Sequence, residues 1–153
     1  MSKLEFTFSG ESQSATKFVG HSRNFQITID EPPGLGGNDE AATPVEYTLA
    51  SLAGCLNVVA YVIAKEMNFT INTLKIDVAG SLHPEKFLGG STENRARFTD
   101  ISATLHVDAD ATQEVLDKWL ATVEERCPVT DNLANATTVN ISTKSLVESA
   151  EAV

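Results

Sequence analysis

The stretch that decides the fold reads TPVEYTLASLAGCLNVVAYVIAKEM and covers residues 43–67. Its first residues carry three helix-start signals: Thr43 as the N-cap, Pro44 at the first helical position, and Glu46 three residues past the cap. Beyond them the apolar side chains are not confined to one stripe, so a single sheet cannot cover them all. We therefore predict a helix from residue 44 to about residue 67 that is covered on all sides.

This helix raises the question of a membrane span. At ~1.5 Å per residue it would be about 35 Å long, which is enough to cross a bilayer. Against a span, Glu46 and Asn57 lower its hydropathy, and amphipathic strands on both sides of it need a helix to cover their apolar faces. We therefore expect no membrane partner, but a homodimer in which a second copy of this helix packs closely. The small residues that would allow that approach are Ala50, Ser51, Ala53 and Gly54.

Strand patterns precede the helix. Residues 4–8 and 25–29 alternate between apolar and polar side chains, and residues 16–19 do so more weakly. This alternation predicts an antiparallel meander with one face in water. Residues 30–40 carry two prolines and three glycines and are predicted to form a loop. Their glycines do not follow a phosphate-binding spacing, so we attribute them to turn geometry.

The second half of the chain repeats the alternation. Residues 70–82 and 98–107 predict two long antiparallel strands joined by a polar loop. A second helix is predicted after Asp110 as its cap, ending before Pro128, and residues 139–141 suit a short last strand. Strands, a long helix, strands, a helix and a strand indicate an α+β fold, and we expect one domain over residues 1–153.

The net charge of the chain and its N-terminal sequence indicate which partners it can bind and in which compartment it is found. The net charge of −10 opposes binding to nucleic acid or to an anionic membrane, because both require a basic patch. No apolar run follows Lys3, so we expect no secretory signal and a cytoplasmic protein. Reducing conditions there favour free thiols over a permanent disulfide.

Two cysteines, Cys55 and Cys127, are the candidates for chemistry. They are open to several interpretations: inert core thiols, a structural bridge, metal ligands or a reactive pair. A metal site is not expected, because the chain has no Cys-x-x-Cys motif and no histidine lies three or four residues from a cysteine. The histidines are His21, His83 and His106.

The positions of the two thiols along the predicted helices bear on their reactivity. Cys55 lies near mid-helix, where burial raises the pKa of a thiol and keeps it inert unless a cation is near. Cys127 lies at a helix C-terminus, where the helix dipole disfavours a thiolate, although Arg126 can offset this. These arguments alone favour two inert core cysteines.

The order of the motifs nevertheless resembles the OsmC/Ohr family of osmotically induced and organic hydroperoxide resistance proteins, in its general OsmC-like branch. The motifs are DEPPGLGG at residues 30–37, the segment at residues 43–56, and Cys127-Pro128-Val129. The most specific parts are a proline eleven residues before a helical cysteine and a second cysteine followed by Pro-Val. The resemblance covers nearly the whole chain. It implies an intertwined two-fold homodimer in which antiparallel sheets wrap around long central helices.

The resemblance also implies thiol peroxidase chemistry. The Cys55 thiolate would attack an organic hydroperoxide, or hydrogen peroxide, and become a sulfenic acid that Cys127 captures as a disulfide. An external dithiol such as a lipoyl group would restore the pair, and no metal or organic cofactor is implied. The dipole argument agrees with these roles, because it gives Cys127 the poorer place for a thiolate.

Two departures from the family pattern concern the other site residues. In the hydroperoxide-resistance branch a glutamate directly follows the helix-opening proline, whereas here Val45 takes that place and Glu46 follows. Glu46 is therefore either a capping residue or a catalytic one. The family also uses an arginine from the N-terminal half to hold the thiolate, and Arg23 is the candidate. The alternatives, in the loop between the long strands, are Arg95 and Arg97.

Two other functions are compatible with the sequence. A protein of this fold could bind a small lipid-like molecule in an apolar pocket near the cysteines without turnover. It could also be a structural dimer with idle thiols. The feature that separates the peroxidase from both is a cation able to reach Cys55.

Overall fold

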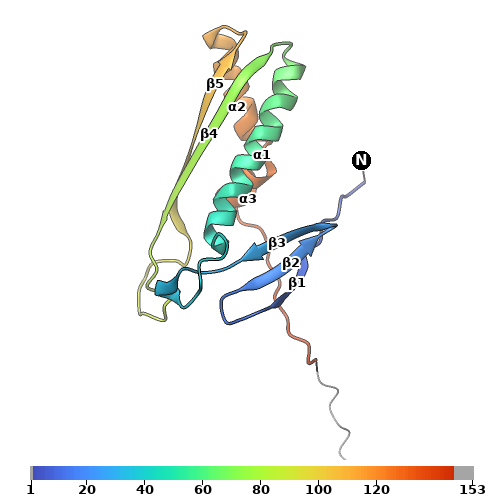
Figure 1. Cartoon of the computed structure of the whole chain (residues 1–153). Helices are drawn as coiled ribbons and strands as arrows, with labels where there is room; N and C mark the ends of the chain where they lie inside the picture. The colour runs from blue at the N-terminus through green and yellow to red at the C-terminus, as the bar shows by residue number, and fades with distance from the viewer. Residues whose placement is uncertain (1, 147–153) are drawn as a thin grey trace, which may run out of the picture.

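The computed structural model describes residues 2–146 (Figure 1). Its strands form two antiparallel sheets, one with the order β1-β2-β3 and one made of β4 and β5. The predicted α+β fold with antiparallel sheets and one long helix is confirmed. In chain order the elements are β1 (Ser9–Ser12), β2 (Phe18–Ser22), β3 (Phe25–Ile29), the 3-10 helix η1 (Pro33–Leu35), α1 (Pro44–Glu66), β4 (Ile71–Leu82), β5 (Phe98–Ala109), α2 (Gln113–Arg126) and α3 (Pro128–Ala134).

The long helix α1 begins at the predicted residue. The Thr43 backbone N–H donates to Glu46 Oε2 over 2.7 Å, and the Glu46 backbone N–H donates to Thr43 Oγ1 over 3.4 Å. This reciprocal pair is a capping box, and it satisfies two N–H groups that the first turn leaves without partners. The helix ends at Glu66, within a residue of the prediction.

The core lies on one side of α1. The β4–β5 hairpin covers that side, and α2 and α3 pack beside it (Figure 1). Leu52, Leu56 and Ile63 of α1 are buried there with Trp119 and Val123 of α2. The hairpin, α1 and α2 therefore form the unit that positions the residues described below.

The opposite side of α1 is open in the single chain. Val58 is 61% exposed, and Tyr61 and Val62 are each 45% exposed, so residues 2–146 of one chain do not provide the expected cover on all sides. By length and composition the helix could cross a membrane, and only 28% of its most apolar 18-residue stretch is buried. Its contacts with β4 and α2 are nevertheless those of a core helix. This apolar side of α1 is left uncovered by residues 2–146.

Two predicted strands are wrong. Residues 4–8 are not a strand, and β1 begins at Ser9, because β2 pairs with residues 9–12 and the preceding residues have no neighbour to accept their hydrogen bonds. Leu4 and Phe6 are accordingly 74% and 89% exposed. Residues 139–141 likewise form no strand. Alternation of side chains predicts a strand only where a partner exists.

Two predictions about the second helix also need correction. Asp110 is not its cap, because its backbone N–H still bonds to Thr70 O at the end of the hairpin; Thr112 caps α2 instead, by accepting from Val115 N. Pro128 ends α2 as predicted, but it also opens the short helix α3, for which Cys127 is the N-cap. Proline suits the first helical position because that N–H has no helical partner.

The loop before α1 is organised around Asp30, which is 1% exposed. Its Oδ2 accepts from the backbone N–H groups of Asn38 and Glu40, over 3.1 and 3.2 Å. Gly37 is needed there, because a Cβ would lie 1.7 Å from Glu31 O. The glycines thus serve turn geometry, and the loop delivers the chain to the start of α1.

Candidate functional site

The structure brings the two predicted cysteines together. Cys55 lies in α1 and Cys127 between α2 and α3, and each thiol shifts the pKa of the other. Both are free, and Cys127 is fully buried whereas Cys55 is partly exposed. A pair of adjacent free thiols with unequal exposure suits sequential thiol chemistry, in which the more exposed sulfur reacts first.

Cys127 has the better environment for a thiolate. Burial raises the pKa of its thiol, but the nearby Thr130 hydroxyl, the Thr130 backbone N–H, the Cys55 thiol and the Val129 backbone N–H together bring the pKa below its usual value. The Thr130 backbone N–H lies 3.5 Å from Cys127 Sγ. The prediction that Cys127 has the poorer place for a thiolate is therefore wrong, because Pro128 starts a new helix whose first N–H groups face the sulfur.

Cys55 has the opposite balance. Burial raises the pKa of its thiol, the Val129 backbone lowers it, and the neighbouring Cys127 raises it again. Within residues 2–146, no basic side chain contributes to the pKa of the Cys55 thiol. The cation that a reactive Cys55 needs is therefore not supplied by the part of the chain that the structure describes.

Arg23 lies in the turn between β2 and β3, with a positive φ of 55°. Its guanidinium carbon is 4.9 Å from the centre of the Phe25 ring, which is a cation–π contact on its own hairpin. The structure does not bring Arg23 to Cys55 within one chain.

Glu46 is held by the helix cap. Its Oε2 accepts from the Thr43 backbone N–H and from Thr43 Oγ1, over 2.7 and 2.9 Å. These bonds lower the pKa of Glu46, with the backbone bond as the larger cause. Its expected capping geometry is present, and its side chain forms hydrogen bonds with Thr43 and not with either cysteine.

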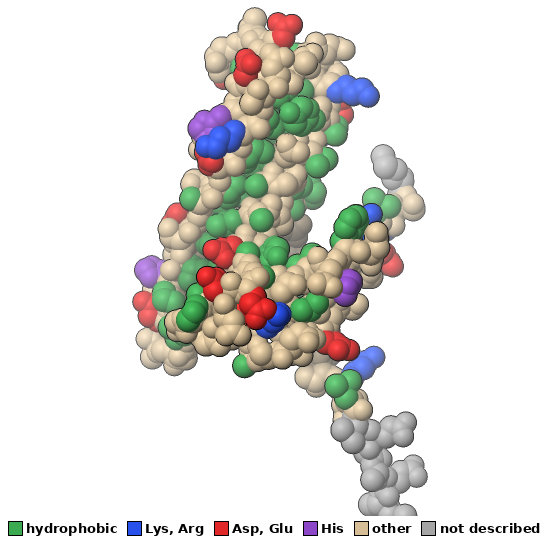
Figure 2. Space-filling model, in the orientation of Figure 1, with side chains coloured by type: hydrophobic (Ala, Val, Ile, Leu, Met, Phe, Trp, Pro, Cys, Tyr) green, Lys and Arg blue, Asp and Glu red, His purple; other side chains and the backbone are tan. Residues whose placement is uncertain are grey.

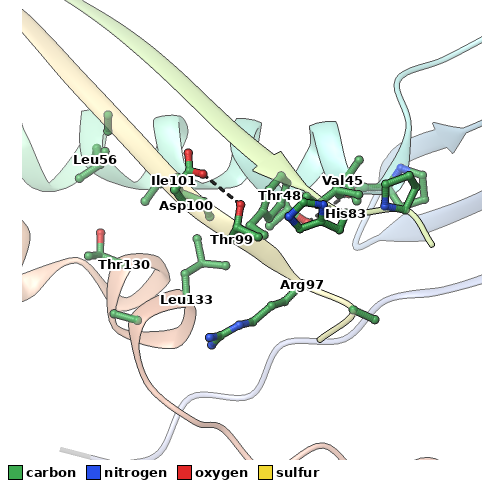
Figure 3. Close-up of a pocket in the computed structure, with 18 of the residues that line it drawn as sticks. Val45, Thr48, Leu56, His83, Arg97, Thr99, Asp100, Ile101, Thr130 and Leu133 are labelled. Carbon is green, nitrogen blue, oxygen red and sulfur yellow. Dashed lines mark hydrogen bonds between the residues drawn. The ribbon is translucent and has the colours of Figure 1, made fainter. Parts of the chain in front are cut away.

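An apolar cleft of about 960 Å³ lies beside the cysteines. Figure 3 shows the side chains that line it. One face of α1 forms a wall with Val45, Thr48, Leu52 and Leu56, and α3 closes the cleft with Thr130 and Leu133. Neither sulfur lines it, but Leu52 and Leu56 flank Cys55 and Thr130 contacts Cys127. Figure 2 shows hydrophobic side chains gathered where α1 and the β4–β5 hairpin meet. The hairpin wall includes Leu82, Phe98, Ile101, Ala103 and Leu105.

Charged side chains stand among these apolar walls. Arg97 extends from the loop before β5 toward α3 (Figure 3), and it was the alternative arginine named from the sequence. Arg95, the other alternative, does not line the cleft. The acidic residues of the cleft are Glu31, Asp100 and Glu124. Within residues 2–146 no three His, Cys, Asp or Glu side chains are grouped to hold a metal.

Sequence reasoning missed Thr130, although a signal was present. Cys127-Pro128-Val129-Thr130 repeats the spacing of Thr43-Pro44-Val45-Glu46: a cap, a proline, a valine and a residue whose backbone N–H donates to the cap. Applied to a cysteine as the cap, the same rule would have predicted α3 and the contact of Thr130 with the sulfur.

Comparisons with known proteins agree with the fold. The crystal structure of an OsmC-like protein from Mycoplasma pneumoniae matches with a TM-score of 0.74 and 22% identity, over 88% of this chain and 89% of that one. OhrB of Bacillus subtilis, an organic hydroperoxide resistance protein, matches with a TM-score of 0.55 and 22% identity, over 84% and 89%. A protein from Legionella pneumophila, described as an organic hydroperoxide resistance protein OsmC, gives 0.61 and 16%, over 86% and 90%.

These identities are low, so the structural likeness establishes the fold and not the chemistry. A search of curated protein sequences finds no match. The family model for OsmC-like protein, however, matches residues 36–142, which span the capped helix, both cysteines and all of the cleft lining except Glu31 and Leu35. The chain therefore belongs to the OsmC-like protein family.

Proposed function

We propose that this protein is a thiol-dependent peroxidase that reduces organic hydroperoxides, and also hydrogen peroxide. The observation that carries the proposal is the pair of adjoining free thiols, Cys55 and Cys127, beside an apolar cleft of about 960 Å³. A cleft of this size and character accommodates the organic part of a hydroperoxide. Relatives of similar fold are named for organic hydroperoxide resistance.

The greater exposure of Cys55 supports giving it the first step. Cys55 is the more exposed of the two residues, and its proton passes to the neighbouring Cys127 thiolate as its sulfur attacks the terminal oxygen of the hydroperoxide. The O–O bond breaks, the alkoxide takes the proton from Cys127 and leaves as an alcohol, and Cys55 becomes a sulfenic acid. Cys127 then displaces hydroxide from that sulfur, and the disulfide is formed. An external dithiol such as a lipoyl group reduces it.

The remaining roles belong to the same proposal. Arg23 stabilises the Cys55 thiolate after an assembly or rearrangement that moves it from the Phe25 ring, and Glu46 adds its carboxylate to the site besides capping α1. The protein acts as a homodimer that covers Val58 and Tyr61 of α1. We take α1 as the core helix of a soluble protein, because such a helix has the same length and composition as a membrane span. We place the enzyme in the cytoplasm, where dithiol reductants are present.

Stopped-flow consumption of cumene hydroperoxide with dihydrolipoamide tests this function. Cys55→Ser is expected to abolish turnover, whereas Cys127→Ser is expected to retain one rapid turnover and leave a sulfenic acid that dimedone traps. Thr104→Ser, on the exposed face of β5, is the control and should match the parent. Unchanged turnover in Cys55→Ser would refute the assignment.

The size of the cleft also supports a second candidate, a binding protein for a small lipid-like molecule. This function predicts binding of an apolar fluorescent probe with equal affinity by the parent, Cys55→Ser and Cys127→Ser proteins. It also predicts no consumption of hydroperoxide by the parent. Leu56→Glu, which places a charge on the cleft wall, should abolish probe binding.

A further inference from the structure

The hydroxyl of Thr130 lacks a hydrogen-bond partner. Thr130 Oγ1 is buried, and within residues 2–146 no acceptor or donor meets it with hydrogen-bond geometry. The residue lies on the first turn of α3 and lines the cleft at the end nearest the cysteines. A buried polar group without a partner is unusual in a native structure and calls for a physical explanation.

The sulfur of Cys127 is the acceptor that this hydroxyl can serve. The Thr130 backbone N–H already donates to Cys127 Sγ over 3.5 Å, and the side chain lies close enough to favour the thiolate. A neutral thiol is a weak acceptor, whereas a thiolate accepts strongly because it is charged. The hydroxyl therefore gains a full hydrogen bond when Cys127 loses its proton.

No cation competes for this role in the described part of the chain. Arg126 directly precedes Cys127, but its guanidinium forms an ion pair with Glu66 at the end of α1, with Nη2 3.1 Å from Oε1. Arg126 does not contribute to the pKa shift of the Cys127 thiol. The stabilisation of a thiolate at Cys127 therefore falls to neutral donors, of which Thr130 supplies two.

We propose that Thr130 is the positioning residue of the resolving step: its N–H and O–H hold Cys127 as a thiolate aimed at Cys55. The proposal rests on the peroxidase function above. In this step the electron pair of the Cys127 thiolate forms the S–S bond with the Cys55 sulfenic acid. The S–O bond breaks, and hydroxide leaves and is protonated by solvent to water.

The timing of this step decides the fate of Cys55. A sulfenic acid that meets a second hydroperoxide before the disulfide closes is oxidised to a sulfinic acid, which a dithiol does not reduce. By keeping Cys127 deprotonated, Thr130 makes closure fast relative to that loss. Thr130 thus protects the enzyme from inactivation by its own substrate.

Thr130→Val is the main test, because it removes the hydroxyl and keeps the shape and the N–H. Thr130→Ser is the rescue variant, because it restores a hydroxyl. Thr122→Val is the matched control, since Thr122 Oγ1 donates to Lys118 O on α2. If Thr130→Val does not fold, Thr130→Ala replaces it, because alanine deletes the hydroxyl without adding a methyl group.

The first measurement needs no peroxide. In a Cys55→Ser background, the ultraviolet absorbance of the Cys127 thiolate is followed against pH. We expect Thr130→Val to raise the midpoint by about one pH unit, and the Ser and control variants to titrate like the parent. An unchanged midpoint in the Val variant overturns the proposal, whether or not the protein is a peroxidase.

The second measurement follows the step itself. After one equivalent of cumene hydroperoxide, quenched-flow mass spectrometry should show disulfide closure slowed roughly tenfold in Thr130→Val near neutral pH, recovering at higher pH. Sulfinic acid at Cys55 should accumulate in this variant and not in Thr130→Ser. A parent-like closure rate overturns the proposal. If the parent forms no sulfenic acid, the peroxidase function fails, and the titration alone then shows whether Thr130 stabilises the thiolate.

Discussion

The indole Nε1 of Trp119 donates a hydrogen bond of 2.9 Å to the carbonyl oxygen of Ala60, and both residues are buried. This bond joins the middle of α2 to the C-terminal half of α1. The Phe69 ring packs edge-on against the indole at 6.1 Å between centroids. Since α2 ends just before Cys127, the contact fixes where that cysteine meets α1.

Trp119→Phe should destabilise the protein by about 1–3 kcal/mol, because the Ala60 carbonyl loses its donor and the smaller ring leaves a void. Chemical denaturation followed by circular dichroism measures the change. Lys118→Gln, on the exposed face of the same helix, should stay within about 0.5 kcal/mol of the parent. Equal stability of the Trp119 variant and the parent would contradict the role of this bond.

Thr43→Ala should cost about 1 kcal/mol of stability, because the first turn of α1 loses the oxygen that accepts from Glu46 N. Glu46→Gln separates capping from catalysis, since glutamine also completes a capping box but carries no charge. Near-parent stability with lost peroxidase activity would support a catalytic carboxylate. Retained activity would leave Glu46 as a cap only.

The stability of the protein should fall in acid because of Asp30. The backbone N–H of Glu31, followed by those of Glu40 and Asn38, outweighs burial and lowers the pKa of Asp30 below its usual 3.8. A lowered folded-state pKa contributes stability that is complete above the unfolded value and is lost as the pH falls through the folded one. Asp30→Asn should therefore lower Tm by several degrees at neutral pH and flatten the decline below about pH 4. Asp108→Asn, on the exposed face of β5, is the control. If the stability of the Asp30 variant falls in acid as much as that of the parent, Asp30 is not the cause of the decline.

Val58→Glu should weaken the proposed homodimer at least roughly tenfold, because it buries a charge in the subunit contact. Sedimentation equilibrium over a dilution series measures the association. Thr104→Glu adds the same charge on the outer face of β5 and should leave the dimer intact. A parent protein that is monomeric at micromolar concentration would eliminate the dimer itself.

Arg23→Ala should slow the reaction of Cys55 with hydroperoxide by roughly 10- to 100-fold, because a nearby cation lowers a thiol pKa by one or two units. The pH dependence of Cys55 alkylation in a Cys127→Ser background measures it, and the midpoint should rise. Arg95→Ala provides a matched loss of charge outside the cleft. A Cys55 thiol that titrates as in the parent protein would reject Arg23.

The features that could be predicted from the sequence are those determined by neighbouring residues in the chain. The start of α1 was predicted to the residue because Thr43, Pro44 and Glu46 act on their own first turn. The start of α3 was missed because Pro128 was interpreted only as a stop signal, and the missed helix reversed the electrostatics of Cys127. Cap chemistry can be predicted from sequence when both effects of a proline are considered.

Non-local features could not be predicted in the same way. Residues 4–8 alternate like a strand, but whether a strand forms depends on a neighbour elsewhere in the chain. The cleft is assembled from α1, the β4–β5 hairpin, α2 and α3, so no single segment contains its pattern. The cleft lies next to the cysteine pair only because these elements pack together.

Trp119 gives the molecule a built-in optical probe. It is the only tryptophan of the chain, so the intrinsic emission at long wavelength has a single origin. It is 2% exposed and lies on α2, eight residues before Cys127, which directly follows the end of that helix; this separation is about 12 Å along the helix axis. Movement of the α2 end that accompanies closure or opening of the cysteine pair is therefore readable as a change in fluorescence, without any added label.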